Sequence, residues 1–300
     1  MNNTAPIIDE NKKQTTIISD LRELFKAGVL LANVLPVFAG FWLALYFTNT
    51  PFLENWQLFL LTISGSTLIM GGALVINNWY DVDIDTIMKR TKNRPTVTGH
   101  MSLKTVLRIG IAFSIIGFIL LLLVSLEAAV YGLVGWVTYV LLYTMWSKRK
   151  YTLNTVIGSV SGAVTPLIGW AAIDSAIHII PLTLFMILFI WQMPHTFAIS
   201  IRKYDEYKAA GVAMLPVVHG IEVTKRQMVT YIACLLPLPI LLASLGTTFL
   251  VIATILHVAW LVIAISGFFT NNNQKWARIN FLCSVNYIVI IFSLMIIVTI

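Results

Sequence analysis

Two acidic residues and an amide recur at a spacing of four where a long apolar stretch ends: Asn77, Asp81 and Asp85. A helix running through them would place all three on one face, because a step of four residues turns only about 40° around the axis. Such carboxylates repel one another unless a cation lies among them. Oxygen ligands without His or Cys suit Mg²⁺, which binds through a few carboxylates, water and substrate phosphates. The spacing predicts a magnesium–phosphate site, with a solvated acidic cap as the alternative; Asp83 would point elsewhere.

Basic residues follow these acids directly. Lys89, Arg90, Lys92 and Arg94 come within nine residues of Asp85. Arginine binds phosphate oxygens through two parallel hydrogen bonds, and lysine acts as a point charge. The run therefore fits a polyphosphate, although basic residues at a membrane boundary also serve as topological anchors.

A second polar group surrounds the sixth apolar stretch, which contains Trp191-Gln192-Met193-Pro194-His195. On a continuous helix His195, Arg202 and Glu206 would lie within roughly 20° of one another. An ionisable residue inside a membrane span indicates function by default. Three interpretations of His195 remain: a satisfied interhelical hydrogen bond, an axial ligand of haem iron and a general base.

Aromatic and small residues form a third group. Tyr139 and Tyr143, one helical turn apart, could present their ring faces to a developing cation. The following stretch has small residues at spacings that permit close helix approach: Gly158, Gly162, Ala163 and Gly169.

The elements that must position these groups are membrane helices. Of the 300 residues, 58% are hydrophobic and only 11% charged, against about 25% charged in soluble domains. The chain is therefore expected to be an all-α polytopic membrane protein, with the third and fourth spans separated only at Ser125, Leu126 and Glu127. Apolar stretches near the length that crosses a bilayer predict about nine transmembrane helices, at 28–47, 57–79, 105–125, 127–146, 153–173, 179–200, 228–245, 247–268 and 279–299.

The charges indicate topology rather than nucleic-acid binding. With the N-terminus inside, all 20 Lys and Arg residues, from Lys12 and Lys13 onward, fall on one side of the nine spans. The positive-inside rule then places the N-terminus in the cytoplasm and the C-terminus outside. Cys234 and Cys283 fall within spans, where thiols act as apolar fillers, and the polar first 27 residues do not suggest a cleaved signal.

Two long inner connections, 80–104 and 201–227, resemble each other weakly. The first closes with Pro95 and Gly99 and the second with Pro216 and Gly220. This pattern fits an internal parallel repeat, and it also fits unrelated turns that end helices.

Together these groups resemble the UbiA-type intramembrane prenyltransferases over residues 25–298, with the segment 77–95 resembling the family's first diphosphate motif. Residues 146–170, 191–195 and 205–218 are similar to its haem-farnesylating branch. The chain departs from the family where Asp205 and Glu206 replace a spaced second aspartate motif, which leaves the ligands of a second Mg²⁺ undefined. The resemblance implies a UbiA-type bundle over 26–300 behind a polar cytoplasmic segment, 1–25.

The resemblance also implies a reaction. Asn77, Asp81 and Asp85 would hold Mg²⁺ on farnesyl diphosphate. The negative charge of the leaving pyrophosphate would be neutralised by five basic residues: Lys89, Arg90, Arg94, Lys148 and Arg149. The acceptor would be a vinyl group of haem B, in a bacterial cell membrane with the active site toward the cytoplasm and a downstream haem A synthase as partner. The alternatives are a prenyltransferase for an aromatic quinone precursor and a cation-coupled transporter. Residues expected at the haem are Trp191, Gln192, His195, Arg202, Asp205 and Glu206.

Overall fold

The computed structural model describes residues 16–300 and forms a bundle of helices, with no strand in that range. Eight of its helices are long and apolar enough to cross a membrane. This confirms the all-α membrane fold. Residues 1–15 of the expected N-terminal segment, with Lys12 and Lys13, lie outside the described residues.

The eight long helices are α2 (Ala27–Thr48), α3 (Phe52–Tyr80), α6 (Leu103–Val124), α7 with the π-helix η1 (Leu126–Val137 and Thr138–Ser147), α10 (Ile179–Arg202), α13 with the 3₁₀-helix η2 (Ile221–Leu235 and Leu238–Leu245), α14 with the 3₁₀-helix η3 (Thr247–Ile265 and Ser266–Phe269) and α15 (Asn273–Ile297).

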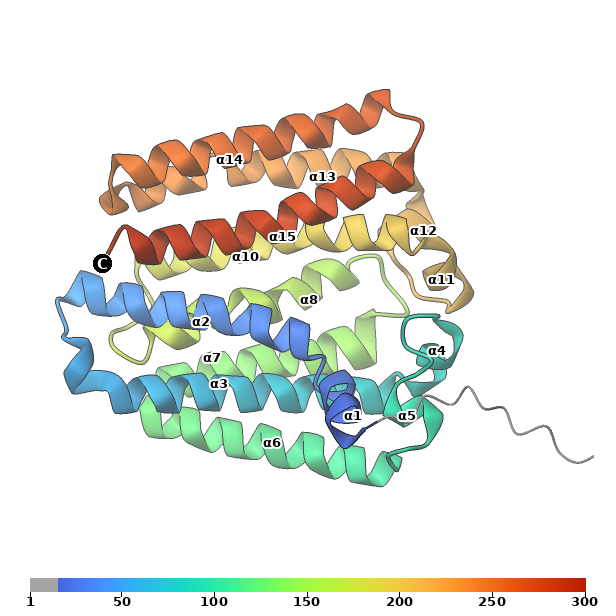
Figure 1. The fold of residues 1–300 in the computed structure, drawn as a ribbon, viewed down its shortest axis with the longest axis horizontal. Coiled ribbons are helices and arrows are strands. Elements are labelled where there is room, and N and C mark those ends of the chain that lie inside the picture. The colour runs from blue at the N-terminus through green and yellow to red at the C-terminus, as the bar shows by residue number, and fades with distance from the viewer. Residues whose placement is uncertain (1–15) are drawn as a thin grey trace, which may run out of the picture.

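The fifth expected span, 153–173, is not one continuous helix. It is divided into α8 (Asn154–Ala163) and α9 (Thr165–Trp170). Pro166 lacks the N–H that would bond to Gly162 O, and the Thr165 hydroxyl donates to that carbonyl instead, over 2.7 Å. Helix α8 still lies in the middle of the bundle, beside α10 (Figure 1). Nine membrane crossings and the orientation of the termini therefore stay predictions.

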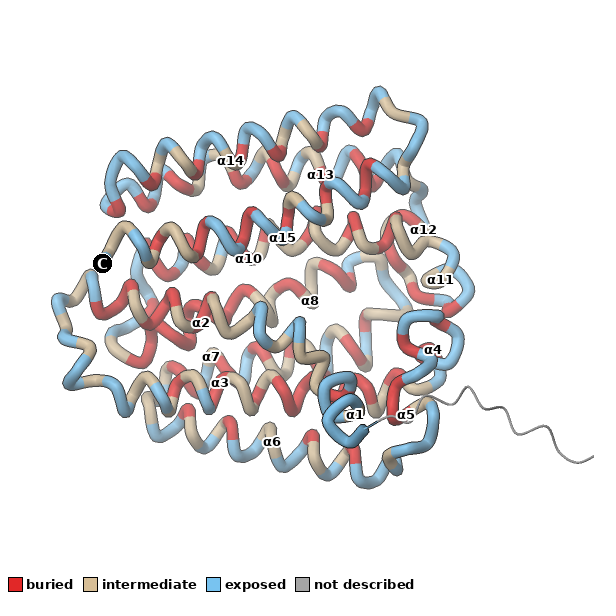
Figure 2. Tube along the Cα trace, in the orientation of Figure 1, coloured by how far each residue is buried: buried red, intermediate tan, exposed pale blue. Residues whose placement is uncertain are grey.

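Close helix contacts form where glycines leave room for a neighbouring backbone. A Cβ on Gly40 of α2 would collide with the backbone of Pro166, and one on Gly169 of α9 would collide with the backbone of Val37. In a membrane, helices associate through such contacts because lipid supplies no hydrophobic driving force. Figure 2 shows the buried residues concentrated on the helix faces that meet inside the bundle. Of the three residues predicted to separate the third and fourth spans, Ser125 alone breaks the helix: it is extended, its hydroxyl caps α7, and Leu126 and Glu127 already belong to α7.

The two long connections have the same local architecture. The first contains α4 (Val82–Ile87) and then α5 (Pro95–Thr98), which ends at Gly99 with φ +80°. The second contains α11 (Tyr204–Ala209) and then α12 (Leu215–His219), which ends at Gly220 with φ +85°. Both lie at the same end of the bundle (Figure 1). This shared order supports an internal repeat over unrelated turns.

Candidate functional site

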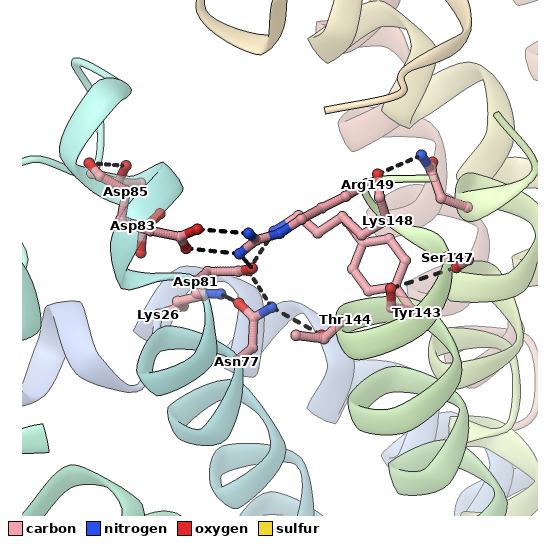
Figure 3. A network of polar contacts seen from close by, with 12 residues as sticks. Lys26, Asn77, Asp81, Asp83, Asp85, Tyr143, Thr144, Ser147, Lys148 and Arg149 are labelled. Carbon is pink, nitrogen blue, oxygen red and sulfur yellow. Dashed lines mark hydrogen bonds and ion pairs between the residues drawn. The ribbon is translucent and has the colours of Figure 1, made fainter. Parts of the chain in front are cut away.

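Asn77 and Asp81 meet at the end of α3, both almost completely buried. The Asn77 amide donates to Asp81 Oδ2 over 2.7 Å and to the Thr144 hydroxyl over 3.0 Å. The continuous helix expected through Asp85 is wrong, because Asp81 leaves helical geometry and Asp85 belongs to α4. Asp85 N still donates to Asp81 O over 2.9 Å. Figure 3 shows Asn77 and Asp81 adjacent and Asp85 further along.

Basic side chains from distant segments converge on these acids. Lys148 pairs with Asp81, and Arg94 pairs with Asp85. Arg149 lies 3.6 Å from Asp81 and binds Asp83 through two hydrogen bonds of 2.6 and 2.7 Å. The Arg149 hydrogen bonds hold the pKa of Asp83 below its usual range. The site thus combines Asp81, between α3 and α4, and the acids of α4 with Arg94, Lys148 and Arg149. Figure 3 shows Lys148 and Arg149 directed toward the acids.

Two of the expected phosphate-binding residues, Lys89 and Arg90, contact none of these acids. Both side chains are exposed at the rim of the first connection. The charge of Arg90 nevertheless lowers the pKa of Tyr207, while burial, the larger effect, raises it. Lys89 and Arg90 therefore lie at the solvent-exposed edge of the site, outside the acid–base contacts.

The polar atoms at the end of α3 fit a hard divalent cation. Asp81 Oδ1 is buried and has no hydrogen-bond donor among the described residues, and a metal ion would satisfy such an atom. No group of three His, Cys, Asp or Glu side chains forms a metal cluster within residues 16–300. A cation here would therefore use Asn77 Oδ1 and the two aspartates together with water and phosphate oxygens, which is the way Mg²⁺ usually binds.

Lys26 is a site residue that the sequence did not reveal. It precedes α2 in a left-handed conformation, φ +47°, which is uncommon for a residue other than glycine. Its ammonium group donates to Asn77 Oδ1. Its position at the start of the first apolar stretch predicted only a topological anchor. No spacing rule connects it to residues 51 positions later.

The second connection packs against the first through apolar side chains. Ile84 and Met88 form one buried cluster with Ala210, Val212 and Met214. Asp205 is exposed and contributes nothing to this contact. The two connections that hold the acids and bases thus form one unit.

The alignment expected for His195, Arg202 and Glu206 is wrong. Helix α10 ends at Arg202, and Lys203 has non-helical geometry, so Glu206 lies on the separate helix α11. Arg202 lies over the Phe281 ring at 5.1 Å. Glu206 binds Lys203 over 2.7 Å, which lowers the pKa of its carboxyl group.

A cavity of about 230 Å³ lies among the helices. Tyr143 connects this cavity with the acid–base cluster. It lines the cavity, and Lys148, which pairs with Asp81, lies 5.9 Å from its ring centre. Tyr139 also lines the cavity, with its ring centre 5.6 Å from that of Tyr143. Both tyrosines belong to η1, a π-helix, and π-helical turns are frequent at functional sites. The cavity wall is mostly apolar, so it suits a hydrocarbon chain whose polar end remains at the acid–base cluster.

The Trp191–His195 segment divides between two sides of α10. Gln192 lines the cavity, and its amide donates to Ser159 O over 3.0 Å. Trp191 and His195 instead contact Ser284 of α15, each over 2.8 Å. This confirms an interhelical hydrogen bond at Nδ1 of His195. Nε2 is not engaged by any described residue.

The chain is similar to known proteins over nearly its full length. The model of the UbiA prenyltransferase family matches residues 33–285. A protein of Oceanobacillus iheyensis named protoheme IX farnesyltransferase is 53% identical over 292 residues, which cover 97% of this chain and 93% of the relative. A Bacillus subtilis (strain 168) protein named protoheme IX farnesyltransferase 2 is 48% identical over 299 residues, covering 100% and 97%.

Solved structures share the fold at low sequence identity. A UbiA homolog from Archaeoglobus fulgidus, bound to DMAPP and Mg²⁺, is 17% identical with a TM-score of 0.69, covering 92% of this chain and 99% of that one. The structure from a study of digeranylgeranylglyceryl phosphate synthase is 18% identical with a TM-score of 0.73, covering 94% and 98%. The family match, the near full-length relatives and the shared fold lead to one assignment. This chain belongs to the UbiA prenyltransferase family.

Proposed function

We propose that this chain transfers the farnesyl group of farnesyl diphosphate to a vinyl group of haem B, forming haem O. The observation that carries the proposal is the 53% identity, over 97% of the chain, to a protein named protoheme IX farnesyltransferase. The site supports it, because an acid–base cluster lies beside an apolar cavity.

The acid–base cluster binds and activates the diphosphate. Asn77, Asp81 and Asp85 would hold Mg²⁺, which when bound offsets charge on the phosphate oxygens. Lys148 and Arg94 already lie at the aspartates, and Lys26 lies at Asn77. These cations stabilise the negative charge that develops as the allylic C–O bond breaks and its electron pair leaves with the pyrophosphate. Arg149, with Lys89 and Arg90 at the rim, adds positive charge around the leaving group.

The cavity protects the allylic cation. Tyr139 and Tyr143 offer ring faces to the cationic carbon, an attraction that grows when water is excluded. The electron pair of the haem vinyl group then forms the new C–C bond. The positive charge moves to the carbon beside the porphyrin, where water adds and loses a proton to leave a hydroxyl group.

The side of α10 that carries Trp191 and His195 receives the haem, with Gln192 contributing from the cavity side and Arg202, Asp205 and Glu206 toward the surface. Arg202 stacks on Phe281, whose ring centre lies 5.2 Å from that of His195. The basic connections at one end of the bundle support a site on the cytoplasmic side of the bacterial cell membrane. A downstream haem A synthase would consume the product.

The test uses purified full-length protein with haem B, farnesyl diphosphate and Mg²⁺, and mass spectrometry of the products. We expect haem that carries the added farnesyl and hydroxyl groups, and none after chelation of Mg²⁺. Transfer to an aromatic quinone precursor, with no haem product, would identify a different prenyltransferase. Ion flux in proteoliposomes without any prenyl transfer would instead indicate a transporter.

A further inference from the structure

One serine of α15 makes two contacts with the Trp191–His195 segment. Ser284 is completely buried. Its backbone carbonyl accepts a hydrogen bond from the Trp191 indole over 2.8 Å, and its hydroxyl lies 2.8 Å from His195 Nδ1. The same hydroxyl lies 2.6 Å from the carbonyl oxygen of Phe281. Ser284 thus fixes both aromatic residues from a single position.

The position of the hydroxyl proton follows from these distances. A serine hydroxyl has one proton, so it can donate to Phe281 O or to His195 Nδ1 but not to both. If it donated to the histidine, two oxygen atoms would lie 2.6 Å apart with no proton between them, which is repulsive. The hydroxyl therefore donates to Phe281 O and accepts a hydrogen bond from His195 Nδ1–H.

This arrangement leaves His195 Nε2 with an unprotonated lone pair. The described residues provide no hydrogen-bond partner for Nε2, and the side chain is not completely buried. The ring is held from two sides, stacked on Trp191 at 4.7 Å and 22° and tilted against Phe281 at 5.2 Å. Thr196 and Gln192, its neighbours on α10, line the cavity.

A second histidine provides an internal comparison. His257 Nδ1 lies 2.6 Å from Ala253 O, which can only accept, so this ring is also protonated at Nδ1. Its Nε2, however, accepts a hydrogen bond from the Tyr287 hydroxyl over 2.9 Å, and the residue is completely buried. Both ring nitrogens of His257 are thus hydrogen-bonded. Of the two histidines, His195 in α10 and His257 in α14, only His195 has a ring nitrogen left for a ligand.

We infer that Ser284 is a positioning residue that holds His195 with Nε2 directed to the iron of the haem acceptor. Histidines that bind a metal almost always donate their other N–H to a fixed acceptor, which sets the tautomer and the ring orientation. Ser284 Oγ is such an acceptor. The inference rests on the proposed function, because it takes haem as the ligand of this side of α10.

The test reads haem binding directly rather than turnover. Full-length protein is titrated with haem B, and the ferrous complex is examined by resonance Raman spectroscopy for an iron–histidine stretching band. We expect the band in wild type and its loss in His195→Ala, with recovery on addition of imidazole. Ser284→Ala should weaken haem binding about 10- to 100-fold and shift the band, with the KM for farnesyl diphosphate unchanged.

Two variants separate positioning from general packing. Ser200 is also completely buried, and its hydroxyl donates to Phe197 O over 2.9 Å without contacting a histidine. Ser200→Ala should leave both the band and haem affinity unchanged, and Ser284→Thr, which keeps the hydroxyl, should retain the band. The inference is overturned if wild type shows no iron–histidine band, or if Ser284→Ala binds haem as wild type does. A Ser284-dependent band without any farnesylated haem would contradict the proposed function alone.

Discussion

Asn77 donates its amide hydrogen to Asp81 Oδ2 over 2.7 Å, one turn away at the end of α3. Since the amide nitrogen is committed to Asp81 and Thr144, Asn77 Oδ1 is the atom that faces Lys26. Two oxygen atoms that could bind a metal ion, Asn77 Oδ1 and Asp81 Oδ1, are therefore held in place by the fold before any substrate arrives.

Asp81→Asn should reduce kcat/KM by about 100- to 1,000-fold, the loss typical when a group that stabilises developing charge is removed. The reason is that Asp81 provides the buried oxygen Oδ1 and also pairs with Lys148. Turnover measured against Mg²⁺ concentration provides the check. Asp83→Asn is the matched control, because Asp83 is exposed and bound to Arg149. Equal activity of the two variants would rule out a special role for Asp81.

Lys26→Met should raise the KM for farnesyl diphosphate by about 10- to 100-fold, the equivalent of one charge-assisted hydrogen bond. The substitution removes the cation at Asn77 and keeps an apolar side chain of similar length. Lys104→Met removes an exposed charge in the first turn of α6 and serves as the control for total charge. Steady-state kinetics in which both variants show the same KM would argue against a direct role for Lys26.

Tyr143→Phe should retain activity within a few-fold, because the ring face remains beside the cavity. Tyr143→Leu should lose about 10-fold in kcat, close to what one desolvated cation–π contact contributes. The ratio of farnesylated haem to free farnesol, measured by liquid chromatography, should also fall in the leucine variant. If kcat fell as far in Tyr143→Phe as in Tyr143→Leu, the hydroxyl group and not the ring face would be the important part of the side chain.

Gly169→Ala should destabilise the protein by about 1–3 kcal/mol, as overpacking commonly does. The new methyl group would meet the α2 backbone at Val37 and Phe41. Gly28→Ala is a matched control within α2, because nothing lies within 4 Å of its added Cβ. Thermal unfolding in detergent measures both variants. Equal midpoints would mean that α2 and α9 are less closely packed than described.

The long apolar stretches predicted eight of the helices well, because membrane helices need about 20 apolar residues whatever their neighbours are. The positions at which helices end or divide were harder to predict. Pro166 divides the fifth span, and Asp81 and Lys203 each end a helix that the spacing alone would continue. A four-residue spacing does not reveal where a chain leaves helical geometry.

The site was predictable where the residues are close in sequence, and less so where they are not. Asn77 and Asp81 lie one turn apart, so their contact follows from spacing. The pairs Lys148–Asp81 and Lys26–Asn77 join residues 67 and 51 positions apart. The family resemblance suggested a role for Lys148, but only the packing of α2 against α3 reveals Lys26.

Product analysis in water enriched in heavy oxygen tests whether the chain adds both a farnesyl group and a water-derived hydroxyl group to haem. We expect that haem B gains the mass of one farnesol, with the heavy oxygen in the new hydroxyl group, only when farnesyl diphosphate and Mg²⁺ are both present. The label reports that water captures the cation beside the porphyrin. Formation of labelled farnesol with no change in the haem would show that the farnesyl group is transferred to water and not to haem.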